Sequence, residues 1–103
     1  MTKFVLHVPL YRFTGNELEM IEIDELLNEL LSELSSNGFD GYISKVKSFF
    51  KSRMYDELLI TIFAGDTRVL KIFSKWFKNN NHVLCKESFA YEIGNELVIK
   101  DLK

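Results

Sequence analysis

The sequence contains a single cysteine, a single proline and no long apolar run. Cys85 cannot form a disulfide within the chain, so nothing points to an oxidising compartment. No apolar stretch approaches the roughly 20 residues that a membrane-spanning helix needs. The first residues lack the small-residue cleavage site of a signal peptide. We therefore expect a cytoplasmic protein that forms one domain over residues 1–103.

Aromatic residues, in contrast, are abundant, with nine Phe, four Tyr and one Trp among 103 residues. In a small domain, so many large rings either pack into one core or are partly shared with another subunit, and the second option favours a dimer or trimer. The net charge is −2, but residues 1–40 carry two basic against eight acidic side chains, and residues 41–103 carry eleven against seven. The overall acidity argues against general binding to nucleic acid.

Hydrophobic periodicity predicts alternating strands and helices. The apolar side chains from residue 21 onward repeat at three and four residues, which is typical of a helix, and Gly38 is its expected left-handed cap. The expected elements are strands at 3–11, 42–53, 57–64, 82–86, 89–93 and 97–102, helices at 21–34 and 68–78, and a loop at 12–20.

This order predicts an α+β fold of the ferredoxin-like βαββαβ type, with two helices on one face of an antiparallel sheet. Two features modify it. The second and third strands form an unusually long central hairpin, joined around residues 54–56. A further hairpin with its turn at Gly94 and Asn95 closes the chain at its C-terminal end.

The return strand of the long hairpin reads ELLIT at residues 57–61. An acid followed by aliphatic residues at this place resembles the divalent-cation-tolerance (CutA) proteins and, more loosely, the PII signal proteins. The resemblance covers the topology of most of the chain but few of its residues. Phe63 and Ala64 stand where these families usually have a Lys-Thr pair, so no site residue is carried over. The resemblance implies a homo-oligomer, dimer or trimer, formed through the long hairpin.

Positive charge is concentrated in the first strand of that hairpin, at Lys45, Lys47, Lys51 and Arg53. Strand alternation would place these side chains on one face, with the core on the other. They are our candidates for an interface or anion-binding surface, which would receive an acidic helix of a second subunit, a small anionic ligand or an acidic protein partner. The alternative is a solvated strand face, or an edge that lysines guard against aggregation.

Other candidate chemistry is incomplete in the sequence. His82, Cys85 and Glu87 are ligand types that suit zinc, but a strand would turn His82 away from the other two. We therefore predict no metal site, and we expect Cys85 to be a small buried side chain. His7 has no serine or cysteine at a spacing typical of nucleophilic catalysis.

These observations favour a non-catalytic, oligomeric binding or regulatory module that needs no cofactor. The alternative is a small dimeric α+β-barrel enzyme, in which sheet and helices enclose a substrate cavity. A buried pocket lined by His7, Tyr11 and Tyr42 would favour the enzyme, whereas a filled core and an exposed long hairpin would favour the module.

Overall fold

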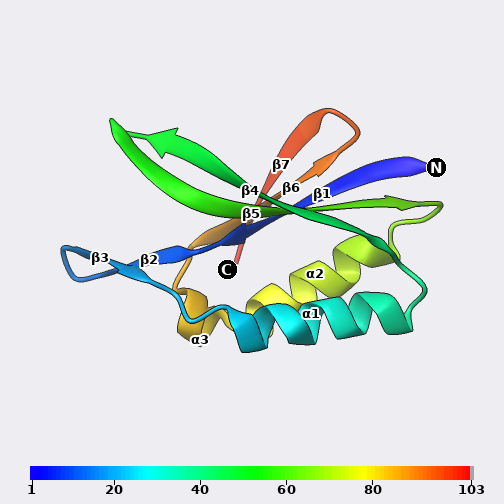
Figure 1. Cartoon of the computed structure of the whole chain (residues 1–103), viewed down its shortest axis with the longest axis horizontal. Coiled ribbons are helices and arrows are strands. Elements are labelled where there is room, and N and C mark those ends of the chain that lie inside the picture. The colour runs from blue at the N-terminus through cyan, green and yellow to red at the C-terminus, as the bar shows by residue number, and fades with distance from the viewer. Residues whose placement is uncertain (103) are drawn as a thin grey trace.

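The computed structural model describes residues 1–102 and has an α+β fold, as the sequence predicts (Figure 1). Its elements are β1 (Thr2–Pro9), β2 (Tyr11–Thr14), β3 (Glu17–Met20), α1 (Asp24–Ser36), β4 (Gly41–Phe50), β5 (Arg53–Ala64), α2 (Arg68–Asn79), α3 (Asn81–Leu84), β6 (Ser88–Ile93) and β7 (Glu96–Asp101). Five strands form one antiparallel sheet in the order β4-β5-β1-β6-β7. β2 and β3 pair separately.

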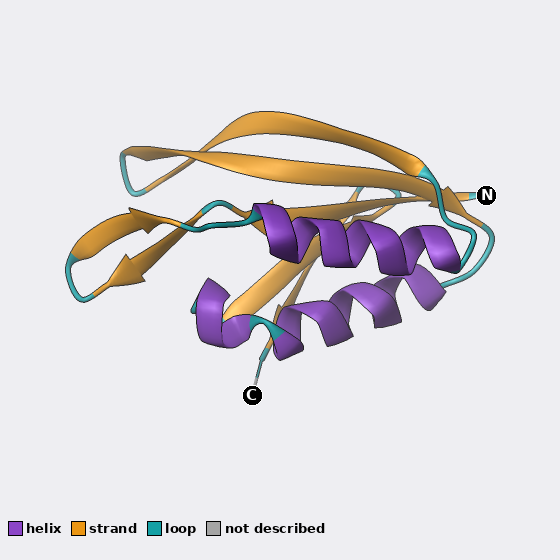
Figure 2. Ribbon diagram, turned by 60° about the horizontal axis from the view of Figure 1, so that its bottom comes forward, coloured by secondary structure: helices purple, strands orange, loops and turns teal. Residues whose placement is uncertain are grey.

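The two long helices lie on the same face of the five-stranded sheet (Figure 2). Alternate residues of β1, such as Leu6, point at these helices and are buried against rings of α2, including Phe73 and Phe77. The indole Nε1 of Trp76 donates a hydrogen bond of 2.8 Å to the carbonyl of Leu26, which fastens α2 to α1. Seven of the 14 aromatic side chains are buried, so about half of the aromatic excess is used in this core.

Helix α1 ends in the way that the sequence predicts. Gly38 has a φ of +81°, and its N–H donates to the carbonyl of Ser35. The N–H of Phe39 donates to Leu34, and both side chains are buried, so the end is a Schellman motif with its hydrophobic contact. The predicted start at residue 21 is wrong, because the helix begins at Asp24.

The long central hairpin is confirmed, but its predicted turn at residues 54–56 is wrong. β4 and β5 stay paired as far as Phe50 and Arg53. The chain reverses at Lys51 and Ser52, whose φ angles are 50° and 64°. Two residues with positive φ match the right-handed twist of the flanking strands, which is why so short a turn closes this hairpin.

Two further segments differ from expectation. The predicted loop at 12–20 is a β-hairpin that turns at Gly15, where φ is +65°. The predicted strand at 82–86 is instead the short helix α3, which ends at Cys85 in the left-handed conformation. The side chain of Asn81 hydrogen-bonds both backbone groups of Lys86, and thus supplies the partners that a sheet would otherwise provide. The predicted C-terminal hairpin is confirmed as β6 and β7.

None of the helices within residues 1–102 combines the length and the apolar character that crossing a bilayer requires.

Gly41 has a steric role at the start of β4. A Cβ added there would lie 2.0 Å from the backbone oxygen of Thr61, which no side-chain rearrangement can relieve. Gly41→Ala should therefore lower the free energy of unfolding by about 1–3 kcal/mol, because the paired strands must move apart. Gly65→Ala is the matched control, since a Cβ at Gly65 meets nothing within 4 Å. Urea unfolding of both variants measures the difference, and equal midpoints would contradict the steric role.

Candidate functional site

The candidate site lies on the sheet face that the helices leave uncovered, here called the open sheet face. The strand register places Tyr42, Thr61, Val5, Glu92 and Leu97 in one row across this face, with one residue from each strand. Val5 and Thr61, at the centre of the row, are buried at 4% and 5% exposure, whereas Tyr42 and Leu97 at its ends are both 58% exposed. The open sheet face therefore has exposed apolar margins.

His7 lies on this face one row further along β1, opposite Leu59. Its Nδ1 is 2.6 Å from a carboxylate oxygen of Glu57 on β5, and its Nε2 is 2.7 Å from one of Glu92 on β6. Each glutamate is in a diagonal position relative to His7 on the neighbouring strand, two residues away from the position directly opposite. Long side chains can make contact over this distance. We call these three residues the His7 cluster; it links the three central strands of the sheet.

The His7 cluster favours a protonated imidazole. A neutral imidazole has one donor and one acceptor nitrogen, whereas the imidazolium donates from both, and here both nitrogens face carboxylates. Burial lowers the pKa of His7, but the hydrogen bonds and charges of Glu57 and Glu92 outweigh it and hold the pKa above its usual value of 6.5.

The pKa of Glu57 is shifted in the opposite direction to that of His7. Burial raises the pKa of Glu57, yet hydrogen bonds from His7 and Ser48 prevail and hold it below its usual value of 4.5. Ser48 of β4 donates its hydroxyl to the second oxygen of this carboxylate. Four strands thus contribute to one polar network on the open sheet face.

A pocket of about 310 Å³ adjoins this network. The β1–β6 ladder consists of three pairs and ends at Leu6 and Tyr91. Beyond that point the two strands are no longer paired. The pocket is lined there by His7 and Pro9 of β1 and by Ser88 of β6. The volume lies at the lower end of the range for small-molecule sites, about 300–1,000 Å³.

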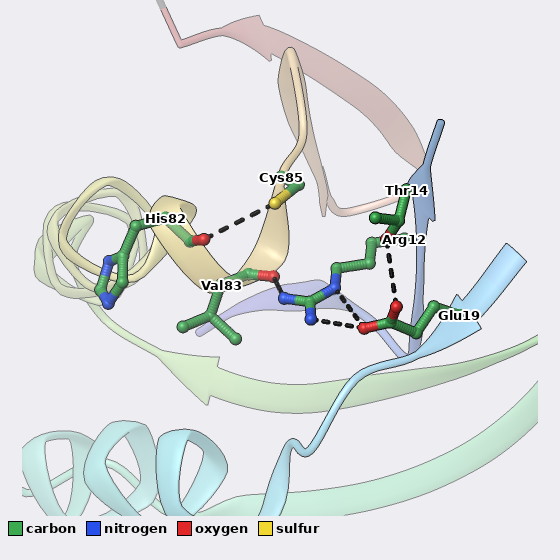
Figure 3. A network of polar contacts seen from close by, with 6 residues as sticks. All are labelled: Arg12, Thr14, Glu19, His82, Val83 and Cys85. Carbon is green, nitrogen blue, oxygen red and sulfur yellow. Dashed lines mark hydrogen bonds and ion pairs between the residues drawn. The ribbon is translucent and has the colours of Figure 1, made fainter. Parts of the chain in front are cut away.

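The β2–β3 hairpin forms another wall of this pocket and is fixed by Arg12 (Figure 3). The guanidinium donates to the carboxylate of Glu19 across the hairpin and, at 2.5 Å, to the carbonyl of Val83 in α3. This connection joins the hairpin to α3. Tyr11 and Phe13, which flank Arg12 in β2, both line the pocket.

The four basic candidates do not form one surface. Lys45 and Lys47 are on β4 and both pair with Asp56, at 3.6 Å and 2.7 Å. They share a sheet face with Leu58 and Ile60, the side that the helices cover, so their predicted orientation away from that side is wrong. The other two candidates lie elsewhere, Lys51 in the turn and Arg53 on β5. A role in an interface or in anion binding stays a prediction for all four.

Cys85 is exposed, so the expectation of a buried thiol is wrong. It follows α3 with a φ of 55°, and its Sγ lies 3.6 Å from the carbonyl oxygen of His82 (Figure 3). Within residues 1–102, no three His, Cys, Asp or Glu side chains are grouped in a way that could hold a metal ion.

Comparison with protein-family models, curated proteins and solved structures gave no significant match for this chain.

Sequence reasoning named His7 as a possible pocket residue but missed its partners. Glu57 and Glu92 are 50 and 85 positions away from it, so only the strand register brings the three together. One signal was available: Glu57 and Glu92 are acids inside predicted strands that are otherwise largely apolar. A charge within such a strand needs a partner, and His7 is the one ionisable residue in the middle of the first predicted strand.

Removing one carboxylate tests the His7 cluster directly. Glu92→Gln should lower the pKa of His7, because the amide lacks the negative charge that favours the imidazolium. NMR titration can follow the imidazole signals, since the chain has only two histidines and His82 provides the second signal. Glu96→Gln, an exposed change on the neighbouring β7, is the control. Identical His7 titrations in both variants would contradict the assignment.

The same cluster makes stability depend on pH. The folded-state pKa of His7 is raised, so its contribution is complete below 6.5 and is lost as the pH rises through the folded value. The folded-state pKa of Glu57 is lowered, so its contribution is present above 4.5 and is lost on acidification. His7→Gln should therefore destabilise most between pH 4.5 and 6.5, and progressively less at alkaline pH, as measured by urea unfolding. A pH-independent difference would exclude an ion pair.

Proposed function

We propose that this chain is a non-catalytic, homo-oligomeric binding module that holds a small molecule in the pocket beside the His7 cluster. The observation that carries the proposal is that each ring nitrogen of His7 is hydrogen-bonded to a carboxylate. An imidazolium with both N–H groups bonded in this way has no nitrogen left to exchange protons with a substrate. It still gives the pocket a polar side chain in a fixed position. Rings such as Phe13 and Phe50 supply the apolar walls that small-molecule sites typically have.

Self-association through the open sheet face is the second part of the proposal. Leu97 and Ile99 on β7 are 58% and 64% exposed, and Phe63 on β5 is 50% exposed. Their places in the register put all three on this face. Exposed apolar surface of this kind marks association sites, and a second copy offers a matching apolar surface.

We also propose that the fold is a variant of the ferredoxin-like arrangement. The order β4-β5-β1-β6, with α1 and α2 on one face, supports this assignment. The β2–β3 hairpin, α3 and β7 are then additions. The likeness to the CutA and PII proteins remains a proposal of the same kind, and it supports oligomerisation without naming a ligand.

The alternative function is the small dimeric α+β-barrel enzyme. One observation favours it: His7 and Tyr11 both line the pocket, although Tyr42 does not. Packing two open sheet faces together would enclose the pocket. Incubation of the purified oligomer with a metabolite mixture distinguishes the two functions, because an enzyme depletes a compound whereas a binding module retains it unchanged.

The oligomeric state is tested by light scattering after size exclusion over a range of concentrations. We expect a dimer or trimer that Ile99→Lys dissociates, with an association constant lowered about tenfold or more, because a charge buried without a partner costs several kcal/mol. Phe49→Lys is the matched change, since Phe49 is also exposed but lies on the helix side of the long hairpin.

The two variants separate the outcomes. Dissociation by Phe49→Lys alone would place the interface on the long hairpin instead of the open sheet face. A monomer mass at every concentration would remove the oligomer from the proposal. Native mass spectrometry of the same samples detects a co-purified small molecule and tests the binding function separately.

A further inference from the structure

One histidine, two acidic side chains and one lysine line the pocket, and the first three are paired. Asp56 contacts Lys45 and Lys47, and Glu57 contacts His7. The fourth is Lys86, whose ammonium has no carboxylate of residues 1–102 within 4.0 Å. Lys86 is thus the pocket charge that still lacks a direct counterion.

The backbone of Lys86 is held in place. Asn81 accepts a hydrogen bond from the N–H of Lys86 and donates one to its carbonyl, each at 2.9 Å. Cys85, just before it, has a left-handed backbone that turns the chain out of α3. This double contact fixes the point from which the side chain enters the pocket.

The side chain of Lys86 is partly buried. Burial lowers the pKa of Lys86, and the electrostatic effects of Cys85 and Glu57 offset this only in part. Burying a charged group is costly unless a partner replaces its water. A ligand that brought a negative charge to this ammonium would supply that partner.

The remaining walls define the rest of the ligand. Aromatic side chains from five different elements line the cavity: Tyr11, Phe13, Phe50, Tyr55, Phe77 and Phe89. Cavities of about 150 Å³ with apolar walls accept a benzene ring. The volume of about 310 Å³ therefore leaves room for a ring and a short polar group.

The negative charge on the ligand has an upper limit. Glu57 lines the same pocket, and the His7 cluster has two carboxylates for one imidazolium, so a dianion such as a phosphate ester meets more repulsion there than a carboxylate does. Asp56 adds little to this repulsion, because Lys45 and Lys47 both contact its carboxylate. A single negative charge matches one unpaired ammonium.

We propose that the pocket binds a small aromatic monocarboxylate whose carboxylate group pairs with Lys86. This inference rests on the proposed binding function and names the chemical class of its ligand. The ring occupies the space between the β2–β3 hairpin and β6, and the carboxylate lies at the Lys86 end.

Calorimetric titration with phenylacetate, phenylacetamide and phenyl phosphate tests the proposal. We expect wild-type protein to bind phenylacetate more tightly than the other two probes. Lys86→Gln should weaken phenylacetate binding about tenfold or more, as expected for loss of a hydrogen bond between charged groups, and should leave phenylacetamide unaffected. Lys100→Gln, an exposed lysine on β7 outside the pocket, is the matched control and should change neither.

Each other outcome has a definite meaning. Equal binding of phenylacetate and phenylacetamide, unchanged by Lys86→Gln, would overturn the carboxylate assignment while supporting a small-molecule pocket. Tighter binding of phenyl phosphate would also overturn it, in favour of a dianion. Absence of binding by all three probes would overturn this inference, whereas a different co-purified compound would still support the binding function. Circular dichroism confirms that Lys86→Gln remains folded.

Discussion

The ion pairs of His7 with Glu57 and Glu92 are the interaction on which the site depends. They join β1 to both of its neighbours at the place where the β1–β6 ladder ends. Beyond Leu6 the backbone of β1 is paired on the β5 side only, so the contact between His7 and Glu92 is a side-chain link to β6 at the end of the ladder. Residues of both strands beyond that point line the pocket. The strand connection and the candidate pocket therefore share His7 and Glu57.

Two contacts outside the five-stranded sheet hold two further walls of the pocket in position. Arg12 binds the carbonyl of Val83, so the β2–β3 hairpin cannot move away from α3 without breaking this hydrogen bond. Asn81 holds the backbone of Lys86 after α3 has ended. The pocket thus has a wall from the hairpin and a wall from the α3–β6 connection, each positioned by one polar side chain. Loops held in this way can present side chains with little freedom, which favours binding.

Much of the fold could be predicted because its signals are local. The period of α1, the Schellman end at Gly38 and the turn at Gly94 each depend on a few neighbouring residues. The pocket walls were missed because their signals are weak or distant: α3 has four residues, and its role depends on the contact of Arg12 with Val83. The His7 cluster required the register of three strands, which a single sequence does not specify.

The basic residues show why the faces of β4 and β5 were hard to assign. Both faces of β5 are largely apolar along residues 58–63, so alternation alone does not say which one the helices cover. The pairing of Ile43 with Ile60 decides the question, because Ile60 belongs to the core and paired residues lie on the same face. Lys45 and Lys47 follow Ile43 at every second residue along β4 and therefore also lie on the helix side. At that end of the hairpin both lysines contact the carboxylate of Asp56. The opposite face also exposes apolar side chains, including Phe63, Leu97 and Ile99. An association driven by that surface would depend little on salt, whereas one driven by the lysines would weaken as salt screens them.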